Sequence, residues 1–333
     1  MKITLFGTQP YDRESFDRIR DAYGFDVTYH RSHLNAGNVA LAEGADVVCI
    51  FVNDTADAAT VARLSQLGVR LIALRCAGFN NVDLLSAAQH GIPVVRVPAY
   101  SPHAVAEHAV ALMLSLNRKI HRAYWRTRDG NFSLHGLLGF DLYGKTAGIV
   151  GTGRIARELI RILRGFGMEV IAYDLCPDEA YAAAAGIAYV PFDELYARAD
   201  IVSLHCPLTD RTRYMIGPEA IGRMKPGVML INTGRGQLIH TGALIDGLKQ
   251  KKIGAAGLDV YEEEAAYFYE DTSDRIMSDD VLARLLSFNN VIVTSHQGFF
   301  TREALDNIAR TTMENIREFA AGEPLTNRVS AGA

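Results

Sequence analysis

Apolar and polar positions alternate with two different periods along the chain. Short apolar runs, rich in β-branched residues, predict a first set of strands at Lys2–Phe6, Phe25–His30, Asp46–Val52, Leu71–Arg75 and Pro93–Val97. Amphipathic stretches such as Arg13–Tyr23 and Ala56–Leu67 lie between these runs and predict helices. Because near-continuous apolar strands separated by helices are typical of a parallel sheet covered on both faces, the pattern predicts an α/β domain.

A second set of the same kind follows a long helical segment, Pro102–Arg118. Its predicted strands are Ala147–Val150, Glu169–Asp174, Ile201–His205, Val228–Asn232, Ala255–Val260 and Val291–Ser295. The whole pattern therefore predicts two doubly wound parallel-sheet domains, Rossmann-like or flavodoxin-like, with a cleft between them.

The composition is that of a globular protein without a strongly charged partner. The 333 residues include 49% apolar and 22% charged residues, and the net charge is −4. Because an acidic chain does not attract nucleic acid or an anionic membrane surface, we expect neither as a partner. A small anionic substrate remains possible, since a single buried Arg can bind it. Met1–Gly7 predicts a strand rather than a signal peptide, and Glu107 and His108 interrupt the apolar stretch Val105–Leu116, so we expect no membrane span.

The four cysteines, Cys49, Cys76, Cys176 and Cys206, show neither a CxxC pair nor metal-ligand spacing. All four lie in or beside apolar strand-like runs, where cysteine usually behaves as a small buried hydrophobic residue. We therefore expect buried free thiols, no metal site and a cytoplasmic location, since a reducing compartment suits unpaired cysteines.

A glycine-rich turn opens the second strand set. Gly151 permits a tight strand-to-helix turn, Gly153 lets the backbone approach a pyrophosphate, and Ala156 allows close packing of the helix that follows. Asp174, at the end of the next strand, is placed to accept hydrogen bonds from an adenosine ribose. A tight turn with a helix-capping Asp is the structural alternative. No Arg follows Asp174 to hold a 2′-phosphate, so the pattern favours NAD over NADP.

Arg235 lies just after a predicted strand, between Gly234 and Gly236. Ligands of open α/β sheets bind at the carboxyl ends of the strands, and flanking glycines let a backbone approach a ligand closely. A planar guanidinium can bind a carboxylate through two hydrogen bonds and polarise an adjacent ketone. The alternative is an ion pair with a surface acid.

His296 ends the last predicted strand of the second set. A histidine there can give a proton to a carbonyl oxygen while hydride arrives at the carbon, and take it back in reverse. A carboxylate against the other ring nitrogen would orient the ring and favour its protonated form. The candidates are Glu262, Glu263 and Glu264, although three consecutive Glu residues are also typical of a solvated turn.

The remaining histidines suggest other roles. His205 follows the strand beside the nucleotide loop, where we expect it to line a cofactor pocket. His103 and His108 fall in the long helix and are expected to be packed or interfacial.

Four motifs resemble, in order and spacing, those of the D-isomer-specific 2-hydroxyacid dehydrogenases. They are Gly151–Ala156 with Asp174, Thr233–Gly236, Gly257–Tyr261 followed by Glu264, and Thr294–Gln297. Within that family, the fermentative D-lactate dehydrogenases are similar at Tyr269–Asp271, Asp279–Asp280, Leu285–Phe288 and His296–Thr301. Gly298 is a departure, because close relatives often carry a larger residue there, and it leaves the size of the substrate pocket open.

The resemblance implies a role for each matching residue. Arg235 would bind the substrate's carboxylate and keto oxygen, His296 would be the acid/base, and Glu264 would orient it. NAD would be held by Gly151, Thr152, Gly153, Arg154, Ile155, Asp174, His205, Cys206, Pro207, Thr233, Gly234, Arg235, Asp259 and His296. The substrate would be held by Ala77, Gly78, Tyr100, Arg235, His296 and Phe299, with backbone N–H groups around Ala77 and Gly78 on its carboxylate.

The resemblance also implies a discontinuous substrate-binding (catalytic) domain, 1–100 plus 299–333, and an NAD-binding Rossmann domain, 101–298. The expected reaction is the reversible, NADH-dependent reduction of pyruvate to D-lactate. The alternative substrate is a bulkier, branched-chain or aromatic, 2-keto acid. Phosphoglycerate is disfavoured because residues 75–81 hold no basic cluster, and a non-catalytic NAD-binding repressor would be expected to lack His296.

The segment Leu116–Phe132 predicts an oligomer. It mixes Tyr124 and Trp125 with several Arg residues, and aromatic and Arg side chains are enriched in interface cores. The alternative is a solvated helix with a few buried rings. Family members usually pair through this region, so we expect a homodimer or a dimer of dimers.

Overall fold

The computed structural model describes residues 1–264, 267–269 and 271–330, which form two compact units. Unit 1 contains Met1–Ser101 and the segment from Phe300 onward, whereas unit 2 contains Pro102–Phe299. Each unit is built around one sheet with helices on both faces, so the prediction of two doubly wound α/β domains is confirmed.

Unit 1 has a flavodoxin-like sheet in the order β13-β5-β4-β3-β1-β2. Its strands are β1 (Lys2–Leu5), β2 (Asp26–Tyr29), β3 (Val47–Ile50), β4 (Leu71–Leu74), β5 (Val94–Val95) and β13 (Arg328–Val329). The first five are parallel to one another, and β13 pairs antiparallel with β5. β3 and β4 are buried along their whole length, which explains why they are apolar without alternation.

The helices of unit 1 cover that sheet. They are α1 (Pro10–Asp17), α2 (Arg20–Tyr23), the 3₁₀ helix η1 (Val39–Ala42), α3 (Ala58–Gln66), α4 (Leu84–Gln89) and α13 (Arg302–Ala321). The single helix predicted over Arg13–Tyr23 is wrong. The first helix begins earlier, because a proline at its first turn and a Gln9–Asp12 capping box favour initiation there. It breaks where the Ile19 amide bonds to the Phe16 carbonyl in a tighter turn.

Unit 2 has a fully parallel, seven-stranded sheet in the order β12-β11-β10-β9-β6-β7-β8. Its strands are β6 (Thr146–Val150), β7 (Glu169–Tyr173), β8 (Ala188–Tyr189), β9 (Ile201–Leu204), β10 (Val228–Asn232), β11 (Ile253–Leu258) and β12 (Val291–Val293). The first strand, β6, lies inside the sheet and the chain builds outward from it on both sides, as in a Rossmann fold. The order of the strands therefore reverses between β6 and β9, and this switch point is where such sheets bind ligands.

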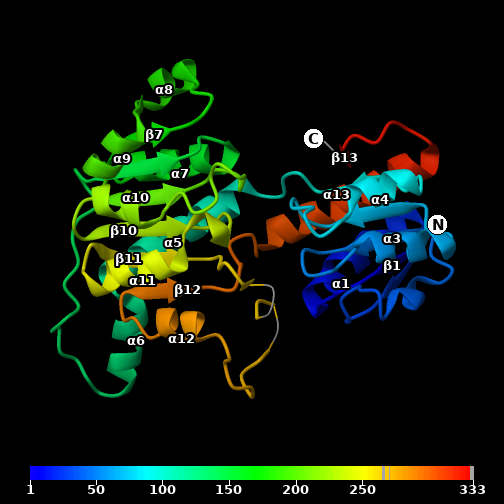
Figure 1. The fold of residues 1–333 in the computed structure, drawn as a ribbon, viewed down its shortest axis with the longest axis horizontal. Coiled ribbons are helices and arrows are strands. Elements are labelled where there is room, and N and C mark those ends of the chain that lie inside the picture. The colour runs from blue at the N-terminus through cyan, green and yellow to red at the C-terminus, as the bar shows by residue number, and fades with distance from the viewer. Residues whose placement is uncertain (265–266, 270, 331–333) are drawn as a thin grey trace. The chain divides into compact units, whose positions relative to one another are not determined.

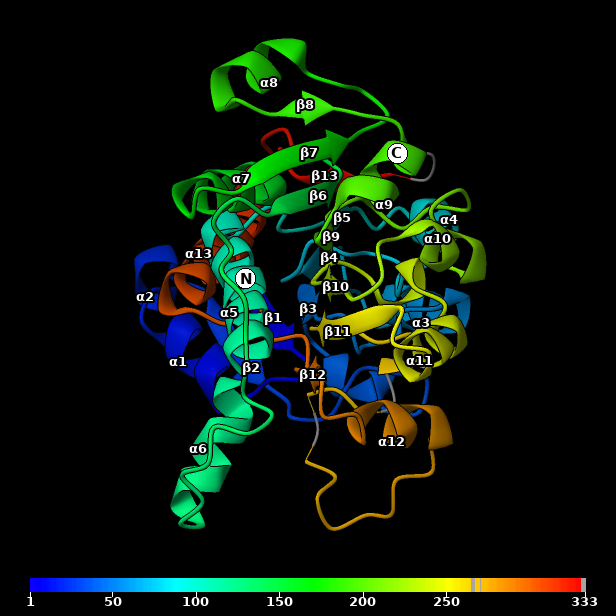
Figure 2. The same cartoon turned by 90° about the vertical axis from the view of Figure 1, so that its left-hand side faces the viewer.

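Helices pack on both faces of this sheet (Figure 1). They are α5 (Pro102–Arg118), α6 (Ile120–Arg128), α7 (Arg154–Gly165), α8 (Glu179–Ala185), α9 (Phe192–Arg198), α10 (Pro218–Arg223), the 3₁₀ helix η2 (Gly236–Leu238), α11 (Thr241–Lys249) and α12 (Asp280–Leu286). One apolar cluster joins α5 and α7 to the strands, and a second joins α9, α10 and α11 to the opposite face. α6 instead projects away from the rest of unit 2 (Figures 1 and 2).

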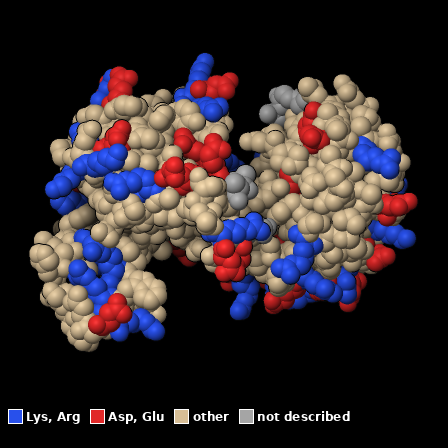
Figure 3. Space-filling view, turned by 60° about the horizontal axis from the view of Figure 1, so that its bottom comes forward, with Lys and Arg blue, Asp and Glu red and all other residues tan. Residues whose placement is uncertain are grey.

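Surface features correct one prediction about the cysteines. Cys49 and Cys76 are buried as expected, but Cys176 is exposed and Cys206 is only partly buried, since Cys176 lies in the turn after β7 and Cys206 in the wall of a cavity. None of the four forms a disulfide with another described residue. Within the described ranges, no helix is both long and apolar enough to cross a membrane. Basic and acidic side chains are interspersed on the face shown in Figure 3.

Candidate active site

The candidate residues of unit 2 follow neighbouring strands at the carboxyl edge of its sheet. The ends of β6, β7 and β9 carry the glycine-rich turn, Asp174 and His205. On the other side of the switch point, β10, β11 and β12 lead directly into the segments of Arg235, Asp259 and His296. The residues expected to bind the cofactor and those expected to carry out the chemistry thus lie along one edge of the same sheet.

The glycine-rich turn has the geometry of a dinucleotide loop. Gly151 has φ +87°, and a Cβ there would lie 2.9 Å from the backbone of His205 and Cys206, so only glycine fits. Gly153 is the extended N-cap of α7, and a Cβ there would meet nothing within 4 Å. The first amides of α7, from Arg154 and Ile155, have no partner within the helix and offer donors for a phosphate.

Asp174 is held in place from three directions. Its Oδ2 accepts hydrogen bonds from the Thr152 amide at 2.6 Å and the Thr152 hydroxyl at 2.7 Å, and its Oδ1 accepts one from the Cys176 amide at 3.0 Å. Burial raises the pKa of Asp174, but these hydrogen bonds outweigh it and hold the pKa below its ordinary value. The carboxylate is therefore ionised at neutral pH and able to accept further hydrogen bonds.

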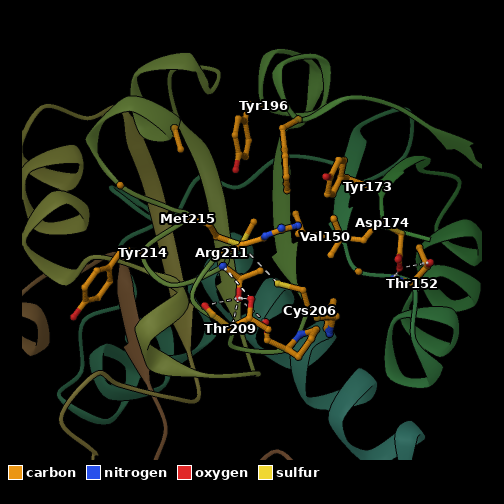
Figure 4. Close-up of a pocket in the computed structure, with 18 of the residues that line it drawn as sticks. Val150, Thr152, Tyr173, Asp174, Tyr196, Cys206, Thr209, Arg211, Tyr214 and Met215 are labelled. Atoms are coloured by element: carbon orange, nitrogen blue, oxygen red, sulfur yellow. Dashed lines mark hydrogen bonds between the residues drawn. The ribbon is translucent and has the colours of Figure 1, made fainter. Parts of the chain in front are cut away.

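A cavity of about 940 Å³ opens beside this loop (Figure 4). Its wall includes Gly151–Gly153, Asp174 and the segment His205–Pro207, with the aromatic rings of Tyr173 and Tyr196. Loss of solvent lowers the pKa of His205 to about 4 and raises the pKa of Cys206 to about 11, so both side chains are neutral at pH 7. An open cradle at Gly153, a helix N-terminus and an ionised Asp174 fit a dinucleotide without a 2′-phosphate.

The Arg235 loop depends on a close approach between two backbones. A Cβ on Gly236 would lie 2.1 Å from the Tyr261 carbonyl, so glycine alone lets this loop pack on the segment that leads to Glu264. Asn232, at the end of β10, fixes the turn by donating to the Arg235 carbonyl at 2.9 Å and accepting from the Gly234 amide at 3.0 Å.

His296 and Glu264 are in direct contact. Nδ1 of His296 lies 2.9 Å from Oε1 of Glu264, whose Oε2 accepts a hydrogen bond from the Tyr261 amide at 3.0 Å. Of the three consecutive carboxylates at 262–264, this is the one that the structure places against the ring. Nδ1 therefore faces the carboxylate, which leaves Nε2 as the nitrogen for a substrate. His296 also has φ +54°, a left-handed backbone conformation that is uncommon outside glycine.

Asp259 is almost fully buried, with 1% exposure, behind the His296 segment. Its carboxylate accepts hydrogen bonds from the Thr294 hydroxyl and the amides of Gln297 and Gly298, and it lies 3.3 Å from Nε2 of His108. The His108 contact was missed from the sequence, where His108 was expected to be packed or interfacial. A polar Glu107–His108 pair within an otherwise apolar helix is the signal that could have identified it.

The other predicted substrate residues divide between the units. Ala77, Gly78 and Tyr100 belong to unit 1, whereas Phe299 is a buried residue of unit 2. The Ala77 carbonyl accepts a hydrogen bond from Nη1 of Arg96 at 2.8 Å, a contact that the sequence did not suggest.

Two further expectations concern residues beyond this set. Glu270, in the stretch that resembles the fermentative enzymes, lies outside the described residues. Among the side chains that the structure does describe, no group of three or more His, Cys, Asp or Glu residues is arranged to hold a metal ion.

A Rossmann unit with an ionised acid after its second strand and a His–Glu pair on the same sheet edge is typical of a dinucleotide-dependent oxidoreductase. Residues 110–298 match the family model described as "D-isomer specific 2-hydroxyacid dehydrogenase, NAD binding domain". The D-lactate dehydrogenase of Escherichia coli is 47% identical over 99% of this chain and 100% of its own, and a "2-hydroxyacid dehydrogenase homolog" of Haemophilus influenzae is 51% identical over 99% of both.

A solved structure agrees over both units. The structure described as "Identification of the pyruvate reductase of Chlamydomonas reinhardtii" has a TM-score of 0.94 at 47% identity and covers 98% of each chain. The present chain belongs to the D-isomer-specific 2-hydroxyacid dehydrogenase family. It is an NAD-dependent enzyme that acts on small 2-hydroxy and 2-keto acids, as the motifs predicted.

Proposed function

We propose that this enzyme reduces pyruvate to D-lactate with NADH, and catalyses the reverse reaction with NAD. The observation that carries the proposal is the His296–Glu264 pair at 2.9 Å, on the same sheet edge as the dinucleotide loop. The relatives named D-lactate dehydrogenase and pyruvate reductase support pyruvate as the substrate.

His296 is assigned the proton transfer. Bound NADH supplies the hydride to the keto carbon, and a proton must reach the keto oxygen as negative charge develops there. Nε2 of His296 donates this proton in reduction and accepts it in oxidation. Glu264 orients the ring through its contact with Nδ1, and the Tyr261 amide holds Glu264 in turn.

Arg235 is assigned the substrate's anionic end. Its guanidinium is suited to bind the carboxylate and polarise the ketone, and its loop is fixed by Asn232 and Gly236. In this proposal unit 1 is the substrate-binding domain, and its Ala77 and Gly78 amides, with Tyr100, meet the carboxylate. Phe299 contributes an apolar wall beside the substrate.

Gly298 bears on the size of the substrate. Close relatives often carry a larger residue at this position. A glycine here could therefore indicate a larger pocket and a bulkier 2-keto acid as the alternative substrate. However, a Cβ on Gly298 would lie 2.8 Å from Oδ2 of Asp259 and 3.4 Å from the ring of His108. The missing side chain therefore makes room for Asp259 rather than for a substrate, which favours pyruvate over branched-chain and aromatic 2-keto acids.

The proposal is tested by comparing kcat/KM for pyruvate, 2-ketoisocaproate and phenylpyruvate, with NADH oxidation followed by absorbance. Pyruvate is expected to be preferred to both larger acids. Each extra methylene or ring that does not fit a pocket typically changes kcat/KM by about 10- to 200-fold, so the comparison has enough range to decide. A higher kcat/KM for either larger acid would replace pyruvate by the alternative.

We also propose a homodimer or dimer of dimers that forms through α6 and the segment after it. Exposed apolar side chains gather there: Ile120, Tyr124, Trp125, Phe132, Leu134, Leu138 and Tyr143. Such a concentration is unusual for a surface that stays in water and is typical of an interface. Four cysteines without a disulfide support the further proposal that the enzyme works in the cytoplasm.

A further inference from the structure

The backbone of His296 is in a conformation that needs external support. Its φ of +54° places Cβ close to the following carbonyl oxygen, and a non-glycine residue adopts this geometry only where the surrounding structure determines it. The imidazole direction depends directly on this backbone, because Cβ carries the ring. Whatever fixes the backbone at 296 therefore also fixes Nε2.

Asp259 contacts the chain before, at and after His296. Its backbone carbonyl accepts the His296 amide at 2.8 Å, and its Oδ1 accepts the Thr294 hydroxyl at 2.5 Å. Beyond His296, the Gln297 amide donates to Oδ1 at 2.9 Å and the Gly298 amide to Oδ2 at 2.8 Å. A single buried residue thus holds both sides of the left-handed turn.

His108 is the ring that keeps this carboxylate in place. It comes from α5, which packs against β11 and β12, and its side chain is 16% exposed. Nε2 lies 3.3 Å from Oδ1 of Asp259 and 3.1 Å from Oγ1 of Thr294. Because the Thr294 hydroxyl hydrogen is directed to the carboxylate, Nε2 of His108 must carry the hydrogen that it shares with these two oxygens.

The environment of Asp259 favours its charged form. Burial raises the pKa of this carboxyl, but hydrogen bonds from His108, Thr294 and Gly298 outweigh burial and hold the pKa below its ordinary value. A charged carboxylate is an acceptor at both oxygens, which the two amides after His296 require. Gly298 is part of the same arrangement, because any Cβ there would collide with Oδ2.

We propose that His108, acting through Asp259, is a positioning residue that holds the His296 backbone in its left-handed conformation. This inference rests on the proposed role of His296 as proton donor. Loss of the His108 donor leaves the buried carboxylate short of a partner, so Asp259 shifts or draws in water and releases the Gln297 and Gly298 amides. The His296 ring then moves away from the substrate oxygen.

The test compares kcat, KM and NADH affinity in His108→Leu and His108→Gln. A misplacement of about 1 Å can lower turnover by about 100-fold, so we expect kcat of His108→Leu to fall by about 10- to 100-fold. NADH affinity, measured by fluorescence titration, is expected to change much less than kcat, because Asp259 and His296 are only two of the residues expected to hold NAD and the cavity at Gly151–Gly153 is lined from β6, β7 and β9. Gln can place an N–H near the position of Nε2, so His108→Gln is expected to recover most of the lost kcat.

Two reference variants make the outcome readable. His103→Leu, on the same helix but paired with Glu158 at the surface, is the matched control and is expected to keep wild-type kcat. His296→Ala tests the proposed function itself, which fails if this variant keeps wild-type turnover.

If His296→Ala loses turnover while His108→Leu keeps wild-type kcat, the positioning role of His108 is overturned. The positioning role is also overturned if His108→Gln recovers none of the kcat lost in His108→Leu, or if His108→Gln shifts the pH dependence of kcat. If His108→Leu does not fold, His108→Asn is measured instead, and the same loss of kcat is expected.

Discussion

Glu264 accepts hydrogen bonds from two directions, the His296 ring and the Tyr261 amide, and this double contact makes it more than a counter-charge. Its neighbours Glu262 and Glu263 differ from it in sequence position only, yet Glu264 is the carboxylate that reaches the ring. The reason is the close approach of Gly236 to Tyr261, which determines the path of the chain just before the three carboxylates. The absence of a Cβ at Gly236 thus helps to select Glu264 as the partner of His296.

The first prediction concerns turnover through this pair. Glu264→Gln keeps the shape of the side chain but replaces the carboxylate that lies against Nδ1 of His296 by an amide. The ring then loses the partner that orients it, so kcat for pyruvate reduction is expected to fall by about 10- to 100-fold. The measurement is steady-state NADH oxidation followed by absorbance.

Controls for this loss lie beside the pair. Glu262→Gln and Glu263→Gln are expected to keep the wild-type kcat. His205, whose pKa is lowered to about 4 by burial, is neutral at pH 7, so the comparison at that pH does not depend on its charge. Wild-type kcat in Glu264→Gln, combined with a loss of kcat in either neighbour, would assign the role to that neighbour instead.

The second prediction concerns cofactor choice at Asp174. The carboxylate is ionised and held by Thr152 and Cys176, so we expect it to accept hydrogen bonds from a ribose and to repel a 2′-phosphate. Asp174→Ala is expected to bring the kcat/KM values for NADH and NADPH closer together, chiefly by weakening NADH binding. Asp178, a half-buried acid four residues later that pairs with Arg157, provides the control through Asp178→Ala. If the ratio in Asp174→Ala equals that of the wild type, the ribose is bound elsewhere.

At the scale of elements, α6 stands apart from the packing that holds the others. None of its residues is buried, and Tyr124 and Trp125 are 55% and 65% exposed. An amphipathic helix is stable in water only when its apolar face is covered, and the described residues leave Ile120, Tyr124 and Trp125 largely exposed. A second copy of the chain is the occupant that we propose.

The third prediction follows from this surface. The wild type is expected to sediment at two or four times the 36.5 kDa of one chain. Introducing charge with Trp125→Glu should shift the equilibrium toward smaller species, because a buried unpaired carboxylate is unfavourable. Leu85→Glu, an equally exposed apolar position on α4, is the control and should leave the mass unchanged. A wild type that sediments as a monomer at micromolar concentration rules the interface out.

At the scale of the whole molecule, the periods of apolar residues predicted the main parallel strands of both sheets, and each βαβ step has one favoured hand that places the strand ends on one edge. The two-residue edge strands β8 and β13 were not predicted, because they are too short to show a period. The glycine-rich turn with Asp174, and the strand-end positions of Arg235 and His296, followed from that logic. The contact between His108 and Asp259 did not, because it joins residues far apart in sequence that share no local pattern. The break between α1 and α2 was missed for a related reason, since packing of Ile19 and Phe16 against one cluster decides it.

The central claim is that hydride from NADH reaches pyruvate on the face that gives D-lactate, with protonation by His296. The most direct measurement is chiral chromatography of the product formed from pyruvate and NADH by the purified enzyme, with His296→Ala in parallel. We predict D-lactate as the only enantiomer, formed in proportion to the NADH consumed, and its loss in His296→Ala. L-lactate as the product, no NADH consumption with pyruvate, or undiminished D-lactate from His296→Ala would contradict the account.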